Sequence, residues 1–174
     1  GLSSSGQTDG GTTARVFGTF LTWLQEKKSP VFVVATCNNV KELPPELLRK
    51  GRFDEIFFVD LPSKQERKDI LKIHLEKRHR KPEEYNIEKL AEMTKEFAGS
   101  ELEEIIVSAL YDAFDEETEL NQTHLENTIN GMVPLSKTMG DQIKGIREWA
   151  KIRAKRASNA SWEDEGNSIR QIEV

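Results

Sequence analysis

Two short apolar segments, residues 31–35 and 56–59, restrict the fold more than any other feature of this 174-residue chain. The first reads V-F-V-V-A and the second I-F-F-V, and neither alternates with polar residues. Continuous β-branched and aromatic runs of this length are typical of strands covered on both faces, as in a parallel sheet flanked by helices. The sequence therefore predicts part of an α/β domain around these two runs.

Helical spacing governs the remainder of the chain. Apolar residues on one face predict a helix from Thr12 or Thr13 to the Ser29-Pro30 stop, and a short helix over residues 43–48. Beyond residue 62 the sequence predicts a bundle of about four helices, followed by one more helix over residues 139–155. Three capping boxes mark predicted helix starts: Ser63 with Glu66, Ser100 with Glu103, and Thr123 with Glu126.

These patterns divide the chain into three parts. Residues 1–61 belong to an α/β domain, residues 62–132 to a helical domain, and residues 133–174 to a helix and tail. Glycine and serine dominate residues 1–11, and polar residues dominate from residue 157 onward, so both ends are expected to be mobile or disordered.

Composition excludes several classes of function. The net charge of -5 argues against a generic nucleic-acid binder, and the basic residues between 144 and 156 are better explained as a solvated helix face. One cysteine cannot form an internal disulfide, which favours a reducing compartment. No apolar run approaches the roughly 20 residues needed to span a bilayer. We therefore expect a protein of the cytoplasm or of an organelle's soluble interior, with no membrane partner.

Three polar residues around the second apolar run are candidates for chemistry. Asn38 follows the first predicted strand, at the sheet edge where α/β proteins bind ligands, and an amide can donate and accept without adding charge. An isolated Asn at a strand end is more often a turn residue. Arg49 and Arg52, in L-L-R-K-G-R-F-D, could fork onto phosphate oxygens, although pairing with nearby Glu46 or Asp54 is the alternative.

The order of these parts resembles the second region of homology of AAA ATPases. The likeness covers residues 12–155, and T-A-R-V-F-G-T-F-L-T-W-L-Q-E-K and P-L-S-K-T-M-G-D-Q-I-K-G-I-R-E-W-A-K are similar to a cyanobacterial and plastid group known as a hypothetical chloroplast reading frame. The resemblance implies that Asn38 is the sensor 1 residue, and that Arg49 and Arg52 are arginine fingers that reach into a neighbouring subunit. It therefore implies a homo-oligomer, a hexameric ring in particular.

The same resemblance implies the fold and the nucleotide contacts. The fold would be the C-terminal part of a P-loop NTPase (AAA+) αβα domain followed by a small helical lid. His74 matches a position near the ribose and adenine, although a lone helical His is often just a partly buried polar residue. Gly99 and Ser100 match an adenine-contacting helix start where many members read glycine-alanine; Ser100 departs from that pattern, and its other role is helix capping.

The phosphate-binding and metal-binding motifs are missing from this sequence. No G-x-x-x-x-G-K-[ST] occurs, and F-F-V-D at residues 57–60 only mimics a Walker B motif because Leu61 follows the acid. Residues 1–11 would correspond to a second pore loop, or to an ordinary solvated loop. We expect the front half of the ATPase to lie upstream, so this chain alone would be inactive and hold no metal.

Two functions follow as hypotheses. In the first, the complete protein binds ATP and Mg²⁺, with the Mg²⁺ ligands in the missing half, and remodels an unknown protein client. In the second, the helical bundle is a non-catalytic protein-interaction module. An in-frame P-loop and acidic pair directly upstream of Gly1 would decide for the enzyme.

Overall fold

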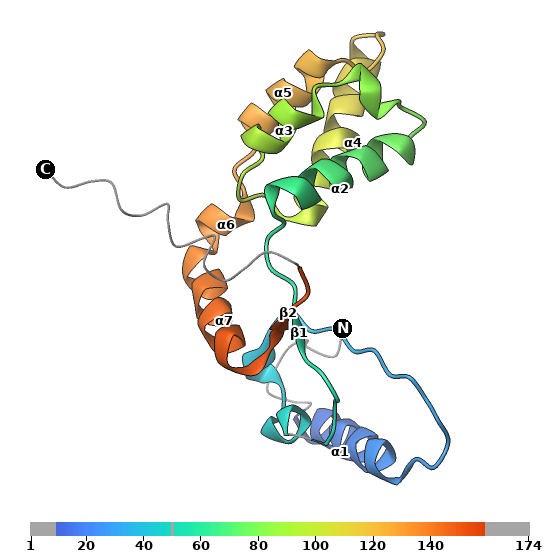
Figure 1. Ribbon diagram of the computed structural model, residues 1–174, viewed down its shortest axis with the longest axis vertical. Helices are drawn as coiled ribbons and strands as arrows, with labels where there is room; N and C mark the ends of the chain where they lie inside the picture. The colour runs from blue at the N-terminus through green and yellow to red at the C-terminus, as the bar shows by residue number, and fades with distance from the viewer. Residues whose placement is uncertain (1–9, 50, 159–174) are drawn as a thin grey trace, which may run out of the picture. The chain divides into compact units, whose positions relative to one another are not determined.

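The computed structural model describes residues 10–49 and 51–158, in two compact units that meet in sequence between Ile56 and Phe57 (Figure 1). The first unit contains α1 (Gly10–Glu26), η1 (Val40–Glu42) and η2 (Pro45–Leu48). The second contains β1 (Phe57–Phe58), α2 (Lys64–Glu76), η3 (Pro82–Glu84), α3 (Ile87–Met93), α4 (Gly99–Asp115), α5 (Gln122–Gly131), α6 (Leu135–Thr138), α7 (Gly140–Arg153) and β2 (Lys155–Arg156). The three-part division made from the sequence stays a prediction.

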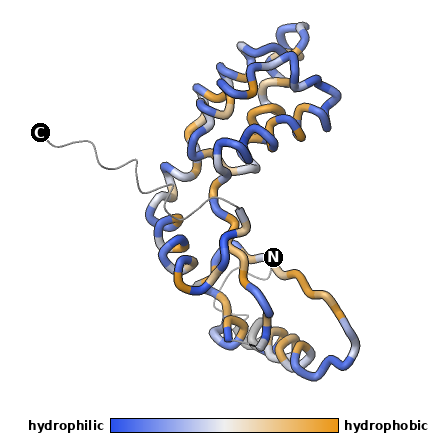
Figure 2. The backbone as a smooth tube through the Cα atoms, in the orientation of Figure 1, coloured by the Kyte–Doolittle hydropathy of each residue, from blue (hydrophilic) through white to orange (hydrophobic). Residues whose placement is uncertain are grey.

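The first apolar run does not form the strand that its sequence predicts. Residues 31–37 form neither a helix nor a strand, and the segment after α1 is coloured hydrophobic over much of its length (Figure 2). The Phe32 side chain is 93% exposed and that of Val34 75%. A strand exists only through hydrogen bonds to a neighbouring strand, and none of the described residues pairs with this segment. The expectation of a strand over residues 31–35 is therefore wrong for this chain.

The second apolar run does form a strand, shorter than residues 56–59. β1 pairs in parallel with β2, with Phe57 opposite Lys155 and Phe58 opposite Arg156. The Ala157 N–H then donates to the Phe58 carbonyl at 2.9 Å. The expectation of disorder from residue 157 onward is therefore wrong at residue 157. Residues 159–174 of the predicted tail and residues 1–9 of the predicted loop lie outside the described residues.

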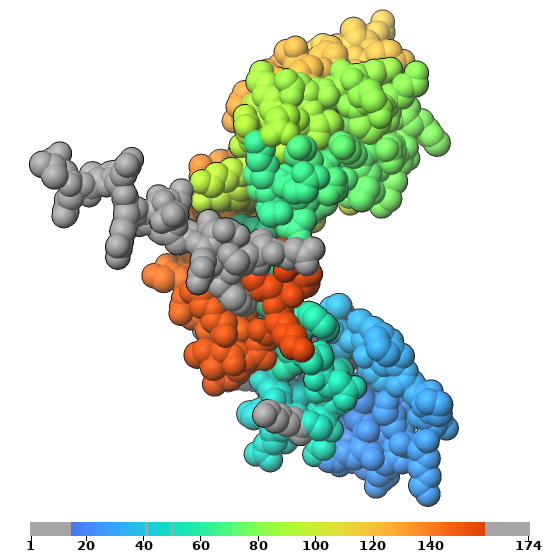
Figure 3. Space-filling model, in the orientation of Figure 1, coloured from blue at the N-terminus to red at the C-terminus, as the bar shows by residue number. Residues whose placement is uncertain are grey.

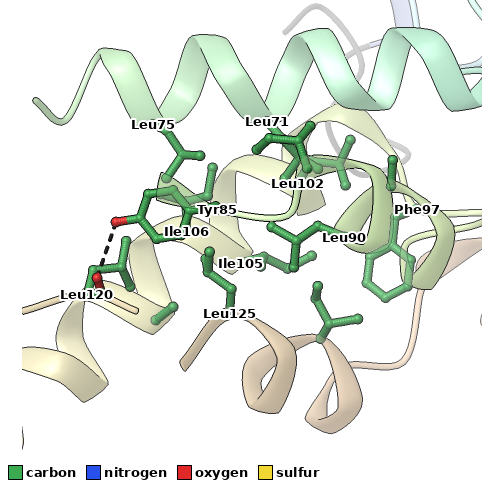
Figure 4. Close-up of a cluster of buried hydrophobic side chains, with 14 of the residues drawn as sticks. Leu71, Leu75, Tyr85, Leu90, Phe97, Leu102, Ile105, Ile106, Leu120 and Leu125 are labelled. Carbon is green, nitrogen blue, oxygen red and sulfur yellow. Dashed lines mark hydrogen bonds between the residues drawn. The ribbon is translucent and has the colours of Figure 1, made fainter. Parts of the chain in front are cut away.

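Helices α2 to α5 form the bundle that the sequence predicts, around one apolar core (Figure 4). The helical spacing of α4 is confirmed, because its inward residues are fully or almost fully buried. Tyr85 belongs to this core, and its hydroxyl donates to the Leu120 carbonyl at 3.2 Å. The largest fully buried side chains are those of Leu71, Leu75, Leu90, Leu102, Ile105, Ile106, Leu125 and Thr94.

One of the three predicted capping boxes is confirmed. The Glu66 N–H donates to Ser63 Oγ at 3.3 Å and the Ser63 N–H donates to Glu66 Oε2 at 2.8 Å, so both halves of the box are present. The predicted box of Ser100 with Glu103 is wrong, because α4 begins at Gly99 and Ser100 lies inside its first turn. Glu101 instead accepts the N–H of Ala98 at 2.7 Å.

The start of the fourth bundle helix also differs from the prediction. Asn121, not Thr123, is the N-cap of α5, and its Oδ1 accepts the N–H groups of Thr123 and His124. The sequence S/T-x-x-E also occurs by chance one turn into a helix, where the serine or threonine has no free amide to cap. The pattern alone therefore places a helix start only to within about one turn.

The predicted helix over residues 139–155 corresponds to α7, which α6 precedes. In the space-filling view the residues of α7 and β2 lie next to one another, coloured orange to red (Figure 3). Across the described ranges, no helix has both the length and the apolar character needed to cross a membrane.

Candidate functional site

Helices α2 and α4 lie side by side, and two residue pairs mark the seam between them. In the first turn of α4, a Cβ placed on Gly99 would lie 3.7 Å from Cδ1 of Ile70 on α2. One turn further along both helices, Nδ1 of His74 lies 3.2 Å from Oε1 of Glu103. The structure thus brings together two of the predicted nucleotide contacts, Gly99 and His74, along one seam.

The His74 side chain is held by an ion pair that the sequence reading missed. Arg78 donates from Nη2 to Glu103 Oε1 at 2.9 Å and from Nη1 to the His74 carbonyl at 3.2 Å. The hydrogen bond from Arg78 is the main cause that lowers the pKa of Glu103, followed by the nearby positive groups. Nδ1 of His74 also lies 3.4 Å from Nη1 of Arg78, so the tautomer of the imidazole decides whether this nitrogen accepts from Arg78 or donates toward Glu103.

The spacing of these residues contained a usable signal. Arg78 follows His74 by four positions, in the turn directly after α2, and Glu103 follows Gly99 by four positions on one face of α4. What the sequence could not show is that the two faces meet, since this depends on how α2 packs on α4.

Ser100 is exposed in the first turn of α4, and Gly99 next to it is half-buried. At Gly99 a methyl group would meet Ile70 at ordinary van der Waals distance, so the backbone itself does not require glycine there. The lack of a large side chain leaves the helix start open beside Ile70. Glu101 already accepts the Ala98 N–H, so it satisfies one of the free amides of this helix start.

Asn38, Arg49 and Arg52 all belong to the first unit. Asn38 is exposed, whereas the neighbouring Asn39 donates from Nδ2 to Glu42 Oε1 at 2.8 Å, as a turn residue would. Arg49 is the exposed C-cap of η2. The Arg52 side chain is half-buried, and both its Nη groups donate to the side-chain oxygen of Gln25 when that amide has the orientation that satisfies both residues.

Neither arginine has an ion pair to Glu46 or Asp54 among the salt bridges of the described residues. The roles of Asn38, Arg49 and Arg52 as sensor and fingers stay predictions, because they concern a nucleotide. Within the ranges that the structure describes, no cluster of three or more His, Cys, Asp or Glu side chains could hold a metal ion.

The basic residues of α7 and β2 are largely engaged within the chain. Arg147 and Arg156 bind Asp60, Lys151 pairs with Glu148 at 3.1 Å, and the Arg153 guanidinium lies 6.0 Å from the Trp149 ring centroid. That nucleic acid is not a partner stays a prediction.

Comparison with known proteins agrees with this architecture. Residues 2–61 match the model of the "ATPase family associated with various cellular activities (AAA)". The chain is 51% identical over 162 residues to an "Uncharacterized AAA domain-containing protein ycf46" of Pyropia yezoensis, covering 92% of this chain and 32% of that protein. The protein of the same name from Guillardia theta is 50% identical over 148 residues, covering 84% of this chain and 29% of the relative.

A more distant relative is the "Probable inactive ATP-dependent zinc metalloprotease FTSHI 4, chloroplastic" of Arabidopsis thaliana, which is 40% identical over 84 residues. That match covers 47% of this chain and 10% of the relative. The chain spans about a third of the length of the ycf46 relatives. It belongs to the AAA family, and its fold is the C-terminal α/β part of an AAA+ domain followed by the helical lid.

Proposed function

We propose that this chain is the sensor, finger and lid portion of an oligomeric ATPase that hydrolyses ATP with Mg²⁺ and remodels a protein client. The observation that carries the proposal is the seam between α2 and α4, where the Ile70–Gly99 contact and the His74–Glu103 pair lie one turn apart. An open helix start beside an apolar side chain and a fixed imidazole suits an adenosine group, which has an apolar ring face and hydrogen-bonding edges.

Each proposed residue has a separate chemical task. Ile70 and Gly99 would contact the base, and the imidazole of His74 would form a hydrogen bond with the nucleoside. Asn38 would orient the attacking water, because its amide can donate and accept at once. Arg49 and Arg52 would stabilise the charge that develops on the γ-phosphate of a neighbouring subunit.

The ligands for phosphate and Mg²⁺ would come from outside this chain. The ycf46 relatives are about three times as long as the matched region, so they have room for such a segment. Hydrolysis, the ring and its subunit number, the client, and a location in the cytoplasm or plastid stroma are all part of the proposal.

A mixing experiment on the full-length protein tests whether the arginines act between subunits. Arg52→Ala alone should lose on the order of 10³-fold in ATP turnover. Asn38→Ala alone should also be strongly impaired, because its own site cannot orient water. In randomly mixed rings about a quarter of interfaces would join an intact Asn38 to an intact Arg52, so activity should recover to about a quarter of wild type.

The control is Lys28→Ala, which removes an exposed cation from the same unit and should leave turnover unchanged. If mixing restores nothing while both variants still assemble, the arginine does not act in trans. If the wild-type protein does not turn over ATP, the enzyme reading is wrong altogether.

A non-catalytic interaction module is the second candidate. Tyr111 and Phe114 lie on one face of α4 and are 71% and 82% exposed, which is unusual for two aromatic side chains so close together. The name of the Arabidopsis thaliana relative FTSHI 4 describes it as probably inactive, so similarity to an ATPase does not by itself establish ATP hydrolysis. Under this reading Tyr111→Ser with Phe114→Ser would abolish binding of a protein partner, and Arg52→Ala would not.

A further inference from the structure

The bundle is attached at both its ends to the same small sheet. The chain leaves β1, forms α2 to α5, and returns through α6 and α7 to place β2 beside β1 (Figure 1). We call residues 135–157 the return segment. In a helical domain held only at its N-terminal end, one connection would set its position, whereas here a second connection runs through the return segment.

The first anchor of the return segment is a buried carboxylate. The Asp60 side chain is 3% exposed, and both its oxygens accept from Arg147 Nε, at 2.9 and 3.1 Å. Arg147 also donates from Nη2 at 2.8 Å, and Nη2 of Arg156 lies 3.4 Å away. A buried carboxylate is costly unless it is paired and hydrogen-bonded, so Asp60 strongly favours the docked position of α7 and β2.

The second anchor lies at the opposite end of the return segment. Glu101 is 8% exposed, and its two oxygens serve different chain segments: Oε1 accepts the N–H of Leu135 at 2.8 Å, and Oε2 accepts the N–H of Ala98 at 2.7 Å. One carboxylate therefore joins the first residue of α6 to the residue that precedes α4. Gly99, which is part of the proposed base contact, follows Ala98 directly in the sequence.

We propose that the return segment is a strut that fixes the start of α4 relative to β1, with Asp60 and Glu101 as its positioning residues. The part of this inference that concerns nucleotide rests on the proposed function. Neither carboxylate would touch the nucleotide; each would act through the position of Gly99 and Ser100. Displacing a binding group by a fraction of an ångström weakens binding without changing the chemistry of the reacting groups.

The structural part can be tested on this 174-residue chain without nucleotide. Arg147→Met keeps the length of the side chain but removes the hydrogen bonds that Arg147 makes to Asp60, which leaves Asp60 with the Leu61 N–H and Arg156 as partners. Lys144→Met removes an exposed charge one turn earlier on α7. Amide hydrogen exchange at Ala157 and along α7 should accelerate at least about 10-fold in Arg147→Met and stay unchanged in Lys144→Met. Core amides of α4, such as that of Ile105, should exchange as in wild type.

Two results would overturn the strut. The first is an Ala157 amide that already exchanges in wild type at the rate of an unstructured peptide. The second is equal exchange in the two methionine variants. If Arg147→Met does not fold, Arg147→Lys keeps the charge but not the bidentate geometry, and should show the same effect at smaller size.

The functional part uses the full-length protein and separates binding from chemistry. Arg147→Met and Glu101→Gln should each raise KM for ATP about 5-fold, with kcat within about twofold of wild type. Because both act through one strut, the double variant should raise KM little more than either single variant. The positioning role would be refuted if the effects of the two substitutions on KM multiply in the double variant. It would also be refuted if the single variants have the same KM as Lys144→Met. A wild-type protein without ATP turnover would refute the proposed function but leave the exchange result standing.

Discussion

Arg67 is a buried cation that faces backbone carbonyls, and its removal should be among the most damaging single changes in the bundle. The residue is 7% exposed. Its Nε and Nη2 donate to the Ala91 carbonyl at 3.1 and 2.9 Å, and its Nη1 donates to the Pro62 carbonyl at 2.8 Å. Ala91 lies in the last turn of α3, where carbonyls lack an intrahelical partner and a positive charge is favourable.

The expected loss for Arg67→Met follows from these three contacts. A hydrogen bond to a charged group contributes about 1.5–3 kcal/mol, and a buried carbonyl left without a partner costs about 1–3 kcal/mol. Part of this is offset, because burial lowers the pKa of Arg67, which shows that the charge itself is desolvated at a cost. The net loss in the free energy of unfolding should be about 3 kcal/mol.

Urea titration of this chain, followed by far-UV circular dichroism, measures the effect. With a slope of about 1.5 kcal/mol per molar urea, the bundle transition should move down by about 2 M. Lys72→Met is the matched control, because Lys72 is exposed on the same helix, and it should move the midpoint by less than about 0.3 M. If the two variants unfold at the same urea concentration, the carbonyl contacts of Arg67 do not stabilise the bundle.

Four further substitutions test the helix starts and one ion-pair cluster. Ser63→Ala should destabilise the bundle by about 1 kcal/mol in a urea titration, because it breaks a complete capping box. Asn121→Ala should cost about as much and Thr123→Ala much less; the reverse order would contradict the assigned cap. Hydrogen bonds, first from Lys64 and then from a second lysine, lower the pKa of Glu88 from 4.5 to about 2. The contribution of Glu88 to stability is therefore complete above about pH 4.5 and disappears as the pH falls toward 2. The difference in the free energy of unfolding between wild type and Glu88→Gln should vanish across that window. A pKa of Glu88 near 4.5, measured by NMR titration, would contradict the ion pairs.

The sequence predicted the helical bundle well because its evidence is local. Spacing along α4 identified the buried face correctly, and the Ser63 box located the start of α2. Helix ends were harder, because α2, α3 and α4 are followed by left-handed residues that are not glycine: His79, Glu96 and Glu117. The usual glycine signal for a helix end was therefore missing at all three positions.

Long-range pairings could not be predicted from these local patterns. Nothing in the sequence around Asp60 indicates that Arg147 and Arg156 bind it, since the partners are far apart along the chain and belong to different elements. The same holds for Glu103, whose contact with His74 depends on the packing of α2 against α4. Residue spacing along one helix predicts which residues share a face of that helix. Only the tertiary fold decides which face of another helix packs against them.

The first apolar run shows how a correct local pattern can still give a wrong local structure. Its composition suits a strand covered on both faces, yet Phe32 and Val34 are exposed and the segment pairs with no strand among the described residues. The second run, of similar composition, becomes a strand only where β2 supplies a neighbour. Strand formation depends on a partner that the pattern itself does not contain. In a longer AAA protein, further strands could pair with this segment and bury Phe32 and Val34. The sequence of the segment would not have to change, because its composition already suits a strand covered on both faces.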